Sequence, residues 1–185
     1  MHHRLTARDM AYIAVFAALI SLCSWLSIPT LVPITLQTFA VFLTVFLLGG
    51  RRGALCVAVY LLLGGVGLPV FSFFRGGPAA LLGASGGYLL GFLPCALILW
   101  LSERWTEGPL LRRFFASLTA LAALYLSGTL WYAMFYLEST PSPGTLLASC
   151  VLPFILPDLL KLSLALFLSY RLKKQAKPHF TSGHL

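Results

Sequence analysis

Six apolar segments take up most of this 185-residue chain, and they constrain its fold more than any other feature. A helix needs about 20 mostly apolar residues to cross a bilayer, and fewer where protein covers part of it. No segment shows the alternation of polar and apolar residues that is typical of a membrane-spanning strand. We therefore predict six transmembrane helices, at roughly residues 9–28, 36–48, 53–68, 86–101, 114–137 and 153–172.

The composition is that of a protein surrounded by lipid. Hydrophobic residues make up 59% of the chain and charged residues 10%, against about 25% charged residues in ordinary soluble domains. A soluble domain of this size still exposes roughly 30% of the surface of its unfolded chain, so it could not hide this much apolar surface. We expect an all-α, multi-pass protein of the cytoplasmic membrane, with a single transmembrane domain over residues 1–185.

The basic residues lie where they would orient such a bundle. With six spans, both termini, the turn at 49–53 and the loop at 102–113 share one side. That side holds 11 of the 13 basic residues: Arg4, Arg8, Arg51, Arg52, Arg104, Arg112, Arg113, Arg171, Lys173, Lys174 and Lys177. The positive-inside rule places that side, with the N- and C-termini, in the cytoplasm. It also explains the net charge of +8 without a nucleic-acid partner.

Several kinds of chemistry lack the residues that they need. The chain contains no G-x-x-x-x-G-K-[ST] motif, which is the pattern of a nucleotide phosphate site. The four histidines lie in the tails, and the four cysteines lack the spacing of metal ligands. We therefore expect no metal, no cofactor and no enzymatic activity. Uphill transport would need energy from another subunit or from an ion gradient.

One serine keeps an enzymatic alternative open. The run Gly83–Ala84–Ser85–Gly86 matches the G-x-S-G pattern of intramembrane serine proteases. A serine nucleophile needs a base within hydrogen-bond reach, and Lys161 is the only substitute for histidine in the apolar region. A tight turn explains the same four residues without any chemistry, and we favour that interpretation.

Asp158 and Lys161 are the most informative polar residues. They are three positions apart, so they share a face of a helix. A bare charge at the centre of a bilayer costs roughly 2.5–3.5 kcal/mol. Pro157 suits the first turn of a helix, which would place Asp158 near the positive end of the helix dipole. The two side chains either form an ion pair that only fixes packing or bind a ligand, and we favour the ligand.

The other polar candidates fit either a ligand site or an ordinary structural role. Arg75 precedes a Gly–Gly turn and either contacts an anion or faces water. Tyr88 is either a membrane-interface residue or a hydroxyl donor to a pocket, and Gln37 either bonds to a neighbouring helix or touches a ligand. The short second and third helices favour a cavity at one membrane face, because irregular backbone is tolerated at depth only where protein covers it.

Small residues recur along the first helix at steps of four, three and four. They form a continuous ridge of Ala7, Ala11, Ala14 and Ala18. Small residues let a second helix approach closely, so the ridge indicates either a partner helix or internal packing.

Short blocks along the chain, in this order, resemble one family of membrane proteins. They are VPITLQTF at 32–39, YLLLGGVGLPVF at 60–71, RGG at 75–77, GGYLLGF at 86–92 and DLLK at 158–161. Together they span roughly residues 8–172. In these blocks the chain resembles the BioY family, the biotin-specific S components of energy-coupling factor (ECF) transporters.

The resemblance implies a six-helix S-component fold with a substrate cavity at the outer face. It implies high-affinity capture of biotin and its uptake across the cytoplasmic membrane, without catalysis by this chain. It also implies docking on a transmembrane coupling subunit with two cytoplasmic ATPase subunits beneath. In such proteins the alanine-rich first helix contacts the coupling subunit, which favours the partner interpretation of the ridge.

The resemblance also assigns residues to the biotin site. Asp158, Lys161 and Tyr88 match family positions, and the charges of Asp158, Lys161 and Arg75 sum to +1, which the carboxylate of biotin would neutralise. Lys161 or Arg75 would meet the carboxylate and Asp158 would accept ureido N–H bonds, or the two ends are reversed. The predicted substrate site consists of Asp158, Lys161, Tyr88, Arg75, Gln37 and Ser85.

The chain departs from the family pattern at two places. Phe73 and Phe74 stand where the family often has small residues, and Pro157 stands where it often has glycine. These departures bear on the shape of one loop and on the start of the last helix. An S component for another vitamin is the alternative function, beside the intramembrane enzyme and a purely structural subunit.

Overall fold

The structure is a computed structural model and describes residues 5–30, 32–106, 110–136 and 143–180. Within these residues the chain is almost entirely helical. The α-helices are α1 (Ala7–Trp25), α2 (Gln37–Leu48), α3 (Gly50–Val66), α4 (Pro78–Leu82), α5 (Gly86–Thr106), α6 (Leu110–Phe135), α7 (Pro143–Cys150) and α8 (Leu152–Phe180). A 3-10 helix, η1, spans Ser72–Phe74, and strands β1 (Ser27–Ile28) and β2 (Ile34–Thr35) pair antiparallel.

Six helices cover the six ranges expected from the sequence, namely α1, α2, α3, α5, α6 and α8. Their ends differ in places. The first helix ends at Trp25 rather than near residue 28, because the chain turns there into the hairpin in which Ser27 lies opposite Thr35. The helices α5 and α8 run past their expected ends. Residue 137, the expected end of the fifth helix, lies outside the described residues.

Length and hydropathy support a membrane-embedded bundle. Among the described residues, four helical stretches are long and apolar enough to cross a membrane, at Ala7–Trp25, Gly86–Glu103, Leu110–Phe135 and Leu147–Gln175. The helix α2 is apolar but shorter, with 12 residues. Six crossings therefore remain a prediction, in which α2 and α3 supply the two short spans.

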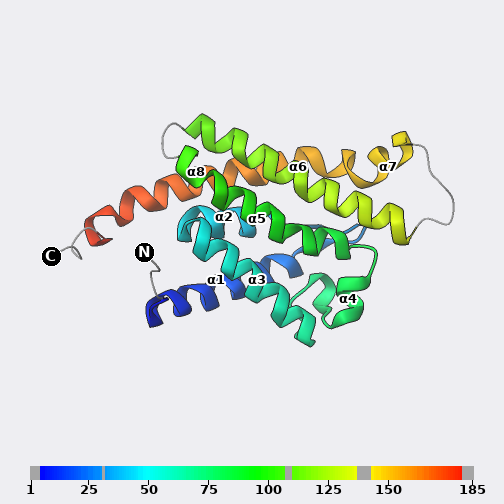
Figure 1. The fold of residues 1–185 in the computed structure, drawn as a ribbon, viewed down its shortest axis with the longest axis horizontal. Helices are drawn as coiled ribbons and strands as arrows, with labels where there is room; N and C mark the ends of the chain where they lie inside the picture. The colour runs from blue at the N-terminus through cyan, green and yellow to red at the C-terminus, as the bar shows by residue number, and fades with distance from the viewer. Residues whose placement is uncertain (1–4, 31, 107–109, 137–142, 181–185) are drawn as a thin grey trace.

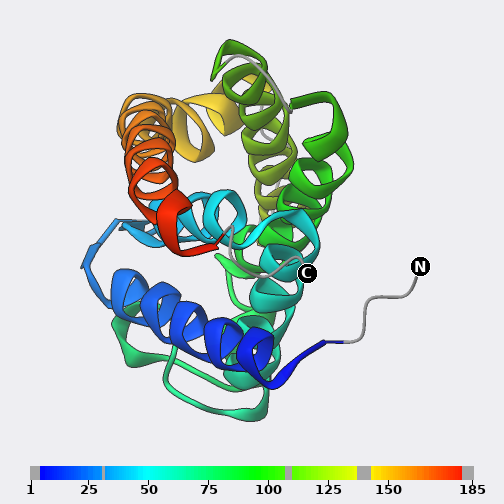
Figure 2. The same cartoon turned by 90° about the vertical axis from the view of Figure 1, so that its left-hand side faces the viewer.

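The helices run along the long axis of the molecule, and both chain ends lie at the same end of it (Figure 1). In the view along the bundle, α1 and α8 lie on opposite sides of α2 (Figure 2). The helix α2 is accordingly the most enclosed, with Ala40, Val41 and Phe42 fully buried. The helix α5 packs closely along α6, whereas α6 meets α8 at few positions.

Polar contacts join three helices at the end that carries the termini. The first turn of α1 is closed by a capping box, in which Thr6 Oγ1 accepts from Asp9 N–H and Asp9 Oδ2 accepts from Thr6 N–H. Asp9 also pairs with Arg52 of α3, at 3.0 Å between Oδ1 and Nε. The backbone N–H of Gly50 donates to Glu103 Oε2 of α5 at 3.0 Å. These contacts fix α1 and α5 against the start of α3.

Glycine allows the close contact between α5 and α6. A Cβ on Gly87 would collide with the Trp131 side chain and lie 2.8 Å from the backbone oxygen of Ser127. We expect Gly87→Ala to lower the free energy of unfolding by about 1–3 kcal/mol, because overpacking a helix contact outweighs the gain of about 1 kcal/mol in helix propensity. Thermal unfolding in detergent measures this effect.

The matched control for this prediction is Gly65→Ala in α3. A Cβ there first meets Leu81 Cδ1, the end of a flexible side chain, at 3.2 Å. The control should therefore leave the unfolding temperature unchanged or raise it. Equal effects of the two substitutions would contradict a role for Gly87 in the contact between α5 and α6.

Candidate substrate-binding site

The site is built around one face of α8. The helix begins at Leu152, so Asp158 lies in its second turn and Pro157 lies inside the helix. The prediction that Pro157 occupies the first turn is therefore wrong. Pro153 occupies that turn instead, where a missing N–H costs nothing, because the helix starts five residues earlier than Pro157.

Asp158 and Lys161 form a buried ion pair, as their spacing on a helix predicts. Lys161 Nζ donates to Asp158 Oδ1 at 2.8 Å, and the two side chains are only 11% and 5% exposed. The second carboxylate oxygen, Oδ2, accepts from the hydroxyl of Tyr125 on α6 at 2.9 Å. Asp158 is thus held by two donors from two helices, rather than by Lys161 alone.

Sequence reasoning missed Tyr125. Its hydroxyl stands in the middle of an apolar segment, and a buried tyrosine hydroxyl normally has a hydrogen-bond partner. The need of this hydroxyl for a hydrogen-bond partner was the one feature of the sequence that could have pointed to Tyr125. It could not identify Asp158 as the partner, because the two residues are 33 positions apart in the sequence.

The ion pair opens onto a narrow cavity of about 50 Å³, here called the inner hollow. Five of the six residues predicted for the substrate site line it: Gln37, Ser85, Tyr88, Asp158 and Lys161. The rest of its wall is mostly apolar, and its other lining residues are Val32, Pro33, Thr35, Thr38, Ser72, Leu89, Phe92, Leu124, Tyr125 and Phe154. The structure therefore brings together residues from α2, α5, α6 and α8.

The sixth predicted residue, Arg75, lines an adjoining cavity of about 450 Å³, here called the outer hollow. This cavity lies between η1, α4 and the start of α5. The two hollows share four lining residues, Pro33, Ser72, Ser85 and Leu89. Arg75 is exposed and sits 5.7 Å from the ring centre of Phe73.

Two of the predicted residues also make structural hydrogen bonds. Gln37 Nε2 donates to the hydroxyl of Tyr60 at 2.9 Å, and that hydroxyl donates to the carbonyl of Val70 at 3.1 Å. The hydroxyl of Tyr88 donates to the carbonyl of Cys150 at the end of α7, at 2.7 Å. Gln37 and Tyr88 therefore shape the wall of the inner hollow while tying their helices to neighbouring segments.

The loop before Arg75 has an unusual backbone. Phe73 and Phe74 have φ values of 58° and 55°, in the left-handed region that side chains rarely adopt. The ring of Phe74 packs on Trp25, with centroids 4.7 Å apart, and the N–H of Phe71 donates to the carbonyl of Arg75. Glycine would adopt these φ values without steric cost, so the contact of Phe74 with Trp25 and the hydrogen bond between Phe71 and Arg75 help to hold the loop in this shape.

The charges of the site favour a small anion. Arg75, Lys161 and Asp158 sum to +1, and the other lining side chains are neutral. A largely apolar pocket with a few polar groups is typical of a site for a small organic molecule. Among the described residues, no three His, Cys, Asp or Glu side chains are grouped in a way that could hold a metal ion.

The alanine ridge lies on the opposite surface of the first helix from the core. Ala7, Ala11, Ala14 and Ala18 are all exposed, whereas Ile13, Ala17 and Ile20 are buried. The ridge is therefore not used for packing within the described part of this chain. It leaves a smooth surface on α1 at which another helix can approach.

Comparison with known proteins agrees with this architecture. The sequence model of the BioY family matches residues 1–178. A protein of Thermotoga maritima named "Biotin transporter BioY" is 38% identical over 169 residues, which cover 90% of this chain and 96% of that protein. A protein of Pyrococcus horikoshii named "Probable biotin transporter BioY" is 36% identical over 168 residues, covering 90% and 97%.

A solved structure has the same fold. It is the S-component for biotin from an ECF-type ABC transporter, with a TM-score of 0.81 and 27% sequence identity. The match covers 92% of this chain and 95% of that one. With the family match over nearly its whole length, the chain belongs to the BioY family.

Proposed function

We propose that this protein captures biotin and serves as the substrate-specific subunit of an ECF-type ABC transporter. The observation that carries the proposal is the buried Asp158–Lys161 pair, which lines a cavity instead of being sealed between helices. The named biotin transporters of the family and the solved S-component support the choice of substrate. The role is capture and passage of the vitamin, not catalysis.

The proposed topology has six spans, both termini in the cytoplasm and the substrate cavity at the outer face. Both termini lie at one end of the bundle, and η1 and α4, which border the outer hollow, lie toward the other (Figure 1). Exposed basic residues gather at the end with the termini, among them Arg8, Arg51, Arg171 and Lys174. The positive-inside rule then supports a cytoplasmic position for that end.

The proposed binding mode uses opposite charges at the two ends of biotin. Asp158 accepts from the ureido N–H groups, and Arg75 in the outer hollow meets the carboxylate, because Lys161 lies 2.8 Å from Asp158 and so stands at the same end of biotin. Charge-assisted hydrogen bonds of this kind are strong in a site that excludes water. With biotin bound, the +1 charge of the three residues is neutralised. Gln37, Ser85 and Tyr88 complete the wall beside the ring system.

The proposed partners are a transmembrane coupling subunit and two cytoplasmic ATPase subunits. The chain carries no nucleotide phosphate motif of its own, so hydrolysis belongs to other subunits. The exposed alanine ridge of α1 offers the coupling subunit a smooth helical surface.

The enzymatic alternative has less support. The structure pairs the ammonium of Lys161 with Asp158, at 2.8 Å between Nζ and Oδ1, and not with the hydroxyl of Ser85. Ser85 directly precedes α5, where its carbonyl accepts the N–H of Leu89. A turn at the start of a helix accounts for this serine.

The deciding experiment is equilibrium binding of labelled biotin to the purified chain, with competition by a panel of other vitamins. We expect one biotin per chain, recovered unchanged, and no competition from the other vitamins. If another vitamin displaces labelled biotin at a lower concentration than biotin itself does, that vitamin becomes the proposed substrate. Turnover of any bound molecule would favour the enzyme, and absence of all binding would leave a structural subunit.

Tyr125→Phe tests whether the hydroxyl that holds Asp158 matters for binding. The substitution removes one hydrogen bond to a buried carboxylate and keeps the ring, so we expect biotin affinity to fall about 10-fold. Tyr132→Phe, on the same helix and outside the lining of both hollows, is the matched control. Isothermal titration of both variants measures the difference, and equal affinities would contradict the role of Tyr125.

A further inference from the structure

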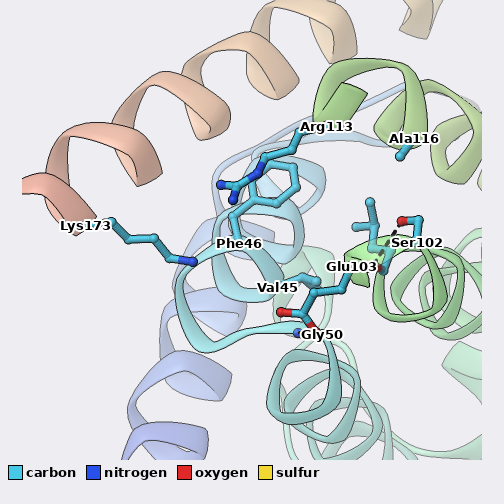
Figure 3. A pocket seen from close by; sticks show the side chains of 9 residues that line it. Val45, Phe46, Gly50, Ser102, Glu103, Arg113, Ala116 and Lys173 are labelled. Atoms are coloured by element: carbon cyan, nitrogen blue, oxygen red, sulfur yellow. Dashed lines mark hydrogen bonds between the residues drawn. The ribbon is translucent and has the colours of Figure 1, made fainter. Parts of the chain in front are cut away.

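A third cavity, also lined by polar side chains, lies at the other end of the bundle, near the termini. This basal hollow has a volume of about 140 Å³ and is lined by Val45, Phe46, Gly50, Leu99, Ser102, Glu103, Arg113, Ala116 and Lys173. Figure 3 shows the guanidinium of Arg113 and the ammonium of Lys173 turned toward the same space, with the carboxylate of Glu103 next to Gly50. None of its lining residues belongs to the inner or outer hollow.

The three charged residues continue the buried stripes of their helices. Lys173 follows Asp158, Leu162, Leu166 and Ser169 on α8, at steps of four, four, three and four, and those four residues are buried. Arg113 lies four residues before the buried Ser117 on α6, and Glu103 four residues after the buried Leu99 on α5. Arg113 and Glu103 are half-buried, and Lys173 is exposed but turns its ammonium into the hollow (Figure 3).

The charge in the basal hollow is positive. Arg113 and Lys173 contribute +2 and Glu103 contributes −1, while Glu103 Oε2 also accepts the backbone N–H of Gly50 at 3.0 Å. The net charge of +1 matches a monoanion. An arginine fork beside a lysine suits a phosphate group, since arginine binds two of its oxygens and lysine adds a point charge.

The surroundings of the basal hollow match a lipid. Arg113 and Lys173 come from α6 and α8, two helices that meet at few positions. The same two helices expose apolar side chains on their other faces, among them Leu111 and Phe115 of α6 and Phe167 of α8. Basic pockets between transmembrane helices on the cytoplasmic side bind the headgroups of anionic lipids.

We propose that the basal hollow binds a phosphate group through Arg113 and Lys173, and that in the membrane this group is the headgroup of an acidic phospholipid. The headgroup fills the gap between α6 and α8 at their cytoplasmic ends. The acyl chains lie along the exposed apolar residues of these helices. The volume is ample for a phosphate with water, because one ordered water needs only about 10–15 Å³.

The test is native mass spectrometry of the delipidated protein with added phosphatidylglycerol or phosphatidylcholine. We expect one phosphatidylglycerol per chain, bound about 30-fold more tightly than phosphatidylcholine. The variant Arg113→Gln with Lys173→Gln should lose this preference. The control, Arg171→Gln with Lys174→Gln, removes the same charge from exposed positions of α8 outside the hollow and should keep it.

Other outcomes are equally informative. If millimolar inorganic phosphate stabilises the protein through Arg113 and Lys173 but phosphatidylglycerol binds no more tightly than phosphatidylcholine, the phosphate site is supported and the lipid is overturned as its occupant. Equal loss in both double variants would indicate general charge attraction and overturn the site. Unchanged lipid binding with impaired docking of the coupling subunit would assign the hollow to an acidic protein segment and overturn the proposal. Size-exclusion profiles and biotin binding at the opposite end report whether each variant is folded.

Discussion

Replacing Lys161 with alanine is expected to weaken biotin binding by roughly 100-fold or more. Asp158 would stay buried beside the cavity with one of its two donors removed. Truncating one partner of a buried, hydrogen-bonded charge pair typically costs 2–5 kcal/mol, or about 30- to 5000-fold in affinity. Asp158→Asn should have a loss of similar size, because the amide cannot supply the negative charge. Equilibrium binding of labelled biotin measures both.

A double substitution separates ligand binding from packing. If the ion pair only fixes helix packing, Asp158→Asn with Lys161→Ala removes both charges together, so the unfolding temperature recovers and biotin binding with it. If the pair binds biotin, stability recovers while binding stays lost. Lys174→Ala, at an exposed position of the same helix, is the matched control and should bind biotin normally. Full binding by the double variant would contradict the proposed site.

The expected helix ranges rest on a signal that is strong and local. Each is an apolar run bounded by proline, glycine or charge, and the six expected ranges fall on α1, α2, α3, α5, α6 and α8. The short elements carry no such signal. The helices α4 and α7 and the hairpin of β1 and β2 are too short for a clear period, and contacts with the rest of the fold select them. The start of the sixth helix was expected at residue 153, one residue from Leu152, but local sequence could not tell which of Pro153 and Pro157 occupies the first turn.

The candidate site was predictable where residue type and spacing within one helix suffice. A step of three residues on a helix brings Lys161 to Asp158, and the structure has that ion pair at 2.8 Å. Contacts between segments that are distant in the sequence could not be predicted. The hydroxyl of Tyr125 bonds to Asp158, and that of Tyr88 bonds to Cys150, across 33 and 62 positions of sequence. Only the packing of α5, α6, α7 and α8 determines these partners.

The alanine ridge also shows what the sequence alone does not determine. The spacing places the four alanines on one face of the first helix, but it does not tell whether that face points to the core or outward. The sequence left internal packing and a partner helix open for Ala7, Ala11, Ala14 and Ala18. The structure leaves all four exposed on α1. Small exposed residues along one face of a membrane helix favour packing by a second helix, because small side chains let the two backbones approach closely.

Ala14→Trp is therefore expected to uncouple transport from capture. The indole projects from the exposed face of α1, so the fold and biotin binding should be unchanged, while a partner helix can no longer approach. Overpacking a close contact costs about 1–3 kcal/mol, which predicts a loss of about 10-fold or more in uptake. Uptake is measured in biotin-auxotrophic cells that supply the coupling module, and binding is measured on the purified variant.

The matched control is Ala122→Trp, which adds the same side chain at an exposed alanine of α6. The control should retain uptake, because a large side chain is tolerated on a helix face that contacts only lipid. Normal uptake by the Ala14→Trp variant would show that α1 does not meet the coupling subunit at this face. Loss of biotin binding together with uptake would instead assign the ridge to the fold. Loss of uptake alone is the result that a docking surface for a partner helix requires.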